Sequence, residues 1–271
     1  MVRLNFSIEL NYEVLSAPSD FVFNIHAARN SQQKVIREQV EFSQPVVPAI
    51  SAECVAGVRF MQLKAEPGLL NVKYLATVEI DHYREKPEKL TEHRASDLPL
   101  TVLPYIFPSR YCQSDQFFDI ATREFGQLPP GYARVRAIRD WVQQNITFKI
   151  GTSTIATSAV DTLRDRVGVC RDFAHLMIAM CRALNMPSRF VTGIDFGADP
   201  SLGPTDFHAY VEVYLGNRWY LFEPSGISPP MGLVRIGTGR DAADASFATI
   251  FGAVRSSMPI ISIEAAEDEA Q

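Results

Sequence analysis

The hydrophobic period of the chain changes near Ser114, and this change constrains the fold more than any other feature. Before it, apolar and polar residues alternate, as they do over residues 4–12 and 72–80, which is the pattern of half-buried strands. After it, apolar residues recur every three or four positions, as in amphipathic helices. The sequence therefore predicts an α+β protein, in which a β-rich part precedes a part that begins with helices.

Residues 1–85 are predicted to form a small β-sandwich domain. Shorter strand-like segments occupy residues 21–26, 34–42 and 56–64, and several short strands at this spacing are typical of a sandwich. Residues 86–113 are predicted to be a connector, because four prolines interrupt any helix there. The leucines and aromatic residues between these prolines indicate that the connector packs against the rest of the protein.

Residues 114–263 are predicted to form the second domain, in which helices come before strands. Four helical patterns are present: one begins at Ser114, one spans about 132–145, one begins at Ser158, and one spans about 170–184. A further short helix is expected at 241–250. Strands are expected at 188–194, 207–215, 218–223 and 257–263. Residues 264–271 are predicted to be a frayed acidic tail.

Composition gives no reason to expect a nucleic-acid or membrane partner. The 271-residue chain carries a formal net charge of −5, whereas binding to nucleic acid or to an anionic membrane favours a basic surface. No apolar run is long enough to span a bilayer, and the first nine residues alternate instead of forming the apolar core of a signal peptide. We therefore expect a cytoplasmic protein, whose oligomeric state the sequence leaves open.

The cysteines and histidines do not predict a metal site. None of the four cysteines, Cys54, Cys112, Cys170 and Cys181, belongs to a C-x-x-C pair, which argues against structural zinc. Their thiols should be free in a cytoplasmic protein. The remaining histidines, His26, His82 and His93, are isolated, so neither a metal nor a cofactor is expected.

Three residues in order predict nucleophilic chemistry. Cys170 stands where an apolar-periodic helix should begin, and the free N–H groups and partial positive charge of a helix N-terminus favour a thiolate. His208 opens a downstream strand-like segment, and Glu223 ends the next one. A nucleophile, a base and a carboxylate that orients the base are what a catalytic triad requires.

A predicted hairpin would bring the last two of these residues together. Gly216-Asn217 is a two-residue turn signal. With that turn, Tyr210 lies opposite Glu223, and Glu223 becomes a diagonal neighbour of His208 on one face of the sheet. A register slip of one residue would move Glu223 to the other face.

Each of these residues also has a structural interpretation. Cys170 taken alone could be a small buried apolar residue, His208 a strand histidine and Glu223 a solvated carboxylate. Asp172 and His175 lie about 200° and 140° around the helix from Cys170, so we interpret both as structural contacts. Cys181 lies on the apolar stripe of the same helix and is predicted to be in the core.

Three ordered segments resemble the transglutaminase-like superfamily, in particular its bacterial branch with a β-rich N-terminal domain. The segments are Gly168-Val169-Cys170-Arg171-Asp172-Phe173-Ala174-His175, Asp206-Phe207-His208-Ala209-Tyr210 and Trp219-Tyr220-Leu221-Phe222-Glu223-Pro224. The resemblance implies a papain-like core with Cys170 as nucleophile and His208 as its base. The third member of the family triad is usually Asp in a Phe-Asp-Pro-Thr context; here it is Glu223, followed by Pro224-Ser225-Gly226.

The sequence thus predicts a cysteine-dependent acyltransferase that acts on amide bonds of a peptide or protein through an acyl-enzyme. Water as the acceptor makes it a peptidase or amidase, which we favour because nothing marks an amine site or a calcium loop. An amine acceptor would make it a protein-glutamine transglutaminase. A non-catalytic peptide-binding module with the same fold is the third alternative. The backbone N–H of Cys170 is a candidate oxyanion donor.

Overall fold

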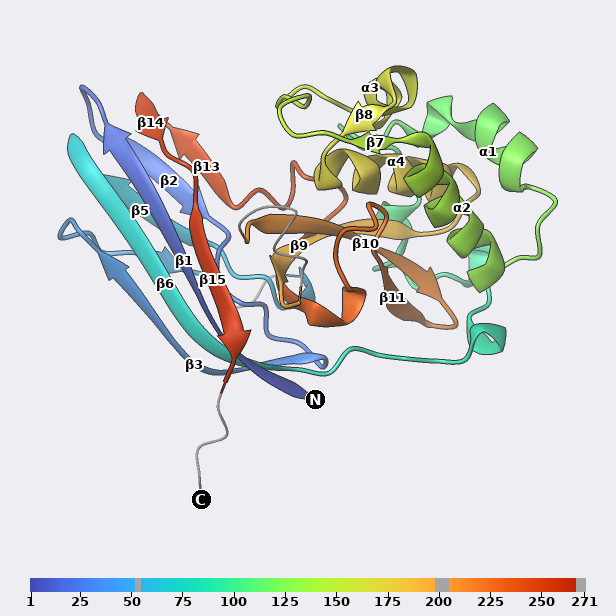
Figure 1. Cartoon of the computed structure of the whole chain (residues 1–271), viewed down its shortest axis with the longest axis horizontal. Coiled ribbons are helices and arrows are strands. Elements are labelled where there is room, and N and C mark those ends of the chain that lie inside the picture. Colours follow the sequence, from blue (N-terminus) through green and yellow to red (C-terminus); the bar gives the residue numbers. More distant parts are fainter. Residues whose placement is uncertain (52–54, 198–204, 267–271) are drawn as a thin grey trace.

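The computed structural model describes residues 1–51, 55–197 and 205–266, and it has the predicted α+β organisation. Figure 1 shows a β-sandwich on one side of the molecule and a helix-covered sheet on the other. Cys54 lies outside the described residues. No helix of the described part is long and apolar enough to cross a membrane.

The sandwich contains two antiparallel sheets. The larger sheet has the order β14-β1-β6-β3, with β15 also pairing with β1; its strands are β1 (Val2–Val14), β3 (Gln33–Phe42), β6 (Gly68–Ile80), β14 (Val254–Ser256) and β15 (Ile260–Ala265). The smaller sheet has the order β13-β2-β5-β4, with β2 (Ser19–Phe23), β4 (Ala49–Ile50), β5 (Met61–Ala65) and β13 (Ala248–Phe251). The alternating apolar residues of β1 point into the core between the sheets, as their period predicts.

The C-terminal segment differs from the prediction. A helix was expected at 241–250, but residues 248–251 form β13, which pairs with β2. The strand expected at 257–263 is β15, which pairs with β1 and extends to Ala265, so Glu264 and Ala265 belong to a strand and not to the predicted tail. Residues 267–271 of that tail lie outside the described residues. Residues 248–265 therefore complete the N-terminal sandwich instead of the second domain, because β1 and β2 each offer an edge for strand pairing that local sequence does not reveal.

The second part consists of helices packed on a four-stranded antiparallel sheet of order β11-β10-β9-β12. The helices are α1 (Phe118–Phe125), α2 (Tyr132–Asn145), α3 (Ala159–Asp165) and α4 (Cys170–Ala183); the strands are β9 (Ser188–Asp195), β10 (Phe207–Leu215), β11 (Arg218–Phe222) and β12 (Leu233–Gly239). Two short strands, β7 (Thr147–Phe148) and β8 (Val167–Gly168), pair in parallel, and β8 leads into α4. Single 3₁₀ turns lie at Val55–Gly57, Pro87–Lys89, Ala95–Asp97, Leu103–Tyr105, Ser114–Gln116 and Pro230–Gly232.

Helix α4 is the centre of this second core. Ala209, Val211, Val213 and Leu215 of β10 share a hydrophobic cluster with buried residues of α4. The opposite face of the same sheet therefore carries the alternate residues of β10, beginning with His208. Strand β12 was not predicted from the sequence. Its Val234 and Ile236 pack into the sandwich core and so join the two parts.

The connector packs as predicted. Leu98, Val102 and Tyr105 are buried, and Leu98 and Val102 form a small cluster with Tyr214 of β10. The connector is therefore part of the folded structure and helps to hold the far end of β10.

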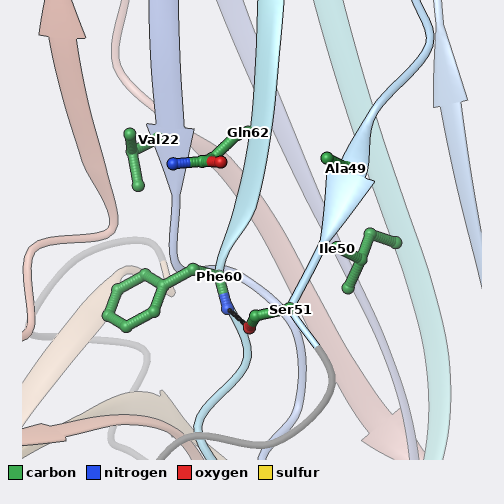
Figure 2. Close-up of a pocket in the computed structure, with 6 residues that line it drawn as sticks. All are labelled: Val22, Ala49, Ile50, Ser51, Phe60 and Gln62. Atoms are coloured by element: carbon green, nitrogen blue, oxygen red, sulfur yellow. Dashed lines mark hydrogen bonds between the residues drawn. The ribbon is translucent and has the colours of Figure 1, made fainter.

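A surface pocket of about 440 Å³ lies at the edge of the smaller sandwich sheet. Figure 2 shows the side chains that line it: Val22, Ala49, Ile50, Ser51, Phe60 and Gln62. None of these side chains is a nucleophile or base of the predicted kind, so this pocket is not the candidate active site.

Candidate active site

The helix that carries Cys170 begins where the sequence predicts, and a buried acidic residue determines that start. Cys170 is the first residue of α4. Asp172 is fully buried, and its Oδ2 accepts a hydrogen bond from the backbone N–H of Val169 at 2.9 Å, which caps the helix. Gly168 makes room for this arrangement, because a Cβ there would lie 2.7 Å from the Cβ of Asp172. The half-buried thiol of Cys170 is consequently presented in the first turn of α4.

The predicted hairpin register is confirmed. Leu215 pairs with Arg218 and Val211 pairs with Phe222. Gly216 and Asn217 form the turn with φ values of 51° and 67°, as a type I′ turn requires. This register places Glu223, directly after β11, on the same face as His208.

The structure brings Cys170, His208 and Glu223 together. The Nε2–H of His208 donates a hydrogen bond to Oε1 of Glu223 at 3.0 Å. Cys170 lies close enough to the same imidazole for its charge to raise the pKa of His208. His208 and Glu223 are buried, with exposed fractions of 5% and 4%.

Glu223 is held by the chain that follows it. Its Oε1 accepts the backbone N–H of Ser225 at 2.9 Å and also the Ser225 hydroxyl, while its Oε2 accepts the backbone N–H of Gly226. These donors fix the longer glutamate side chain in the position where its carboxylate contacts His208. The Glu-Pro-Ser-Gly segment therefore has the geometry that an orienting carboxylate needs.

The charges around His208 favour its protonated form. Burial by itself would lower the pKa of His208, but the negative charge of Cys170, its hydrogen bond, and the carboxylates of Glu223 and Asp195 act in the opposite direction. The net effect raises the pKa of His208 well above its ordinary value. The site therefore favours a protonated His208 imidazole beside the Cys170 side chain.

One acidic residue of this site was not predicted from the sequence. Asp195 ends β9, and its Oδ2 lies 3.7 Å from Nδ1 of His208. The strand was expected to end one residue earlier, at 194. The sequence signal was a carboxylate at the end of a predicted apolar strand. This signal points to His208 only when β9 is known to pair with β10.

The other candidates lie outside this cluster. His175 is fully buried, its Nε2 accepts the backbone N–H of Ala242 at 3.1 Å, and its ring stacks on Tyr111. Cys112 and Cys181 are fully buried, and burial raises the pKa of each thiol to about 12. Both thiols are therefore protonated at neutral pH, which leaves Cys170 as the chemically available thiol of the described residues. No group of three or more potential metal ligands occurs within the described ranges.

Replacing Asp172 with alanine should weaken both the fold and the presentation of Cys170. Loss of the cap leaves the Val169 N–H without its partner, and we expect the free energy of unfolding to fall by about 1–2 kcal/mol. The rate at which iodoacetamide alkylates Cys170 should fall as well, because the first turn of α4 frays. Urea unfolding and an alkylation time course at pH 7 measure the two effects.

The matched control for this substitution is Asp161→Ala in α3. The carboxylate of Asp161 caps Ser158 in the same way, with 3.0 Å between the Ser158 nitrogen and Oδ2. That variant should lose less stability, because the Asp161 side chain is 33% exposed, and it should keep the wild-type alkylation rate. Equal alkylation rates in Asp172→Ala and the wild type would contradict the role given to Asp172.

Comparisons with known proteins agree with the two-part organisation. Residues 120–224 match the family described as the transglutaminase-like superfamily, and residues 2–99 match the N-terminal domain of bacterial transglutaminase. A solved protein from Cytophaga hutchinsonii, named a "putative cysteine protease", is 37% identical, with a TM-score of 0.92; the match covers 100% of this chain and 92% of that chain.

Curated relatives match over a shorter region. An uncharacterized protein of Mycobacterium leprae is 30% identical over 119 residues, which is 42% of this chain and 42% of that protein. An uncharacterized protein of Mycobacterium tuberculosis is 31% identical over 140 residues, 46% of this chain and 45% of that protein. The chain thus spans less than half the length of these curated relatives.

Proposed function

This chain belongs to the transglutaminase-like superfamily, and from this premise we propose that it hydrolyses amide bonds of a peptide or protein. The proposed nucleophile is Cys170, the proposed general acid and base is His208, and Glu223 orients His208. The observation that carries the proposal is the buried His208 imidazole, which interacts with Cys170 on one side and with Glu223 on the other. The name of the Cytophaga hutchinsonii protein agrees with water as the acceptor.

In the first half of the reaction, the Cys170 thiolate attacks the amide carbonyl carbon and forms a C–S bond. Protonated His208 gives its proton to the leaving nitrogen as the C–N bond breaks, so an amine departs and a thioester remains. The backbone N–H of Cys170 lies in the first turn of α4, where helix geometry provides no intrahelical acceptor. It is therefore a candidate donor to the developing oxyanion.

In the second half, water attacks the thioester carbonyl. Neutral His208 takes the water proton as the C–O bond forms, and the C–S bond then breaks to release the acid. The thiolate and the imidazolium are restored together. Glu223 stabilises the imidazolium each time it forms, because its carboxylate accepts the Nε2–H.

The pH dependence of Cys170 alkylation tests this proposal without knowledge of the substrate. An isolated thiol loses its reactivity with iodoacetamide below about pH 8.5, whereas a thiolate paired with an imidazolium remains reactive at pH 6. We expect the wild-type protein to be alkylated at Cys170 at pH 6, as measured by mass spectrometry. The His208→Ala variant should need alkaline pH for the same rate.

Identical pH profiles of alkylation in the wild type and the His208→Ala variant, both rising near the free-thiol pKa, would refute the pair and favour a non-catalytic peptide-binding module.

If the pair is present, a peptide library incubated with and without a primary amine distinguishes the two acceptors. New amino and carboxyl termini indicate hydrolysis. A mass increase that corresponds to the added amine at glutamine indicates transamidation instead.

A further inference from the structure

A second buried carboxylate lies beside the imidazole of His208, across the ring from Glu223. His208 pairs with Gly193 across β10 and β9, so Asp195 is its diagonal neighbour on the same face of the sheet. Asp195 is 5% exposed, and its Oδ2 is 3.7 Å from Nδ1 of His208. His208 therefore has a diagonal carboxylate on each neighbouring chain segment: Glu223 on one side and Asp195 on the other.

The Asp195 carboxylate is held in place by two hydroxyl groups. The Tyr210 hydroxyl donates to Oδ1, and the Ser228 hydroxyl donates to Oδ2. The Tyr210 ring also packs edge-on against the His208 ring, with 4.9 Å between the ring centroids. Tyr210 thus fixes the imidazole and the carboxylate relative to each other.

Two donated hydrogen bonds favour the ionised form of an acid. Burial and the nearby Glu223 carboxylate raise the pKa of Asp195, while the positive charge of His208 and the Ser228 and Tyr210 hydroxyls reduce this rise without cancelling it. A positive charge on His208 therefore favours the ionised carboxylate of Asp195. If Asp195 served only to bind the Tyr210 and Ser228 hydroxyls, its carboxylate would not need to lie 3.7 Å from Nδ1 of His208.

We propose that Asp195 is a positioning residue for His208, whose carboxylate stabilises the imidazolium at its Nδ1 edge while Glu223 holds Nε2. This inference rests on the proposed function and deepens it. Its importance is greatest after acylation, when Cys170 is a neutral thioester and no longer contributes a negative charge. At that stage, His208 takes a proton from water at Nδ1, and Asp195 stabilises the cation that results.

The other ionisable groups around His208 come from several elements. Cys170 approaches from α4, Tyr210 from the same strand and Glu223 from the segment after β11, and Asp206 directly precedes β10. Asp206 has an exposed side chain, so water screens its charge. Asp206→Asn is therefore a matched control for Asp195→Asn: the chemical change is the same, but Asp206 is exposed whereas Asp195 is buried.

The experiment is an NMR titration of the full chain labelled with ¹⁵N in its histidine side chains. In Asp195→Asn, we expect the pKa of His208 to fall by about 1 or more relative to the wild type, because a nearby buried charge is lost. In Asp206→Asn, the shift should be several-fold smaller. An unchanged His208 titration in Asp195→Asn, even with a lower melting temperature, overturns the inference and leaves only a structural role.

A second variant covers the case in which Asp195→Asn does not fold. In the double variant Cys170→Ala, Glu223→Gln, Asp195 is the remaining buried carboxylate beside His208. The pKa of His208 should then stay above the ordinary value of about 6.5, whereas burial alone would lower it. A pKa at or below 6.5 overturns the inference.

Alkylation of wild-type Cys170 at pH 6 separates this inference from the proposed function. A reactive wild type combined with an unchanged His208 titration in Asp195→Asn refutes the inference alone. A wild type that is unreactive at pH 6 refutes the proposed function and the inference together.

Discussion

Replacing Cys170 with alanine should lower kcat/KM for amide hydrolysis by at least about 10³-fold, since removal of a nucleophile leaves only the contributions of binding and the oxyanion site. The fold should persist, because Cys170 is half-buried at the helix start and contributes little to the core. Cleavage of a peptide library by the purified variant, followed by mass spectrometry, measures the loss. Far-ultraviolet circular dichroism should show the wild-type secondary structure.

Cys181→Ala is the matched control for this experiment. It removes a thiol from the same helix, but that thiol is fully buried in the hydrophobic core. The variant should lower the melting temperature, because a cavity replaces the sulfur atom, and it should leave the rate of cleavage intact. Wild-type cleavage by Cys170→Ala would exclude thiol catalysis.

Replacing Glu212 with glutamine should destabilise the protein by about 3–5 kcal/mol, as expected when one partner is removed from a buried ion pair. Glu212 of β10 is 1% exposed and lies between Arg189 and Arg235. The Arg189 Nη2 is 2.7 Å from its Oε2. Without the carboxylate, two buried guanidinium groups face each other without a counter-charge. Urea unfolding at pH 7 measures the loss.

The stabilisation by Glu212 should depend on pH. Burial would raise the pKa of Glu212, but Arg235 and Arg189 outweigh it and lower the value to about 2. Because the folded pKa lies below the unfolded one, this stabilisation is complete above about pH 4.5 and is lost as pH falls toward 2. The stability difference between the wild type and Glu212→Gln should therefore shrink across this range.

A surface ion pair provides the comparison for Glu212. Glu13 and Arg255 are 3.1 Å apart, and their side chains are 47% and 73% exposed. Glu13→Gln should change the free energy of unfolding by no more than about 1 kcal/mol, with no marked pH dependence. A loss at Glu212 as small as the loss at Glu13 would show that the buried charges are not coupled as the geometry indicates.

Local sequence was sufficient where neighbouring residues determine the structure. Helix α2 spans Tyr132–Asn145, the range its apolar stripe predicts, and α3 begins directly after Ser158, where its helical pattern was predicted to begin. The hairpin between β10 and β11 also follows from its own residues, because the turn at Gly216-Asn217 sets the register. Since that register fixes which side chains share a face, the contact between His208 and Glu223 could be predicted from sequence.

Local sequence failed where the partner is distant in the chain. Residues 241–250 carry a pattern compatible with a short helix, yet Ala248–Phe251 pairs with β2, more than 200 residues earlier. Strand β12 was missed for a similar reason, since its burial depends on both β9 and the sandwich core. The pairing of such segments depends on which strand edges of the folded sheets are still unpaired and on whether their apolar side chains can be buried there.

The sequence by itself determined the two kinds of structure, the thiol at the start of α4, and the register that places Glu223 beside His208. Each of these depends on residues within one helix, one turn or one hairpin. Only the tertiary structure decided that the C-terminal strands complete the sandwich and that Asp195 lies at Nδ1 of His208. Both depend on the pairing of separate strands, which results from burial of apolar faces in the whole molecule and leaves no signature in the period of one segment.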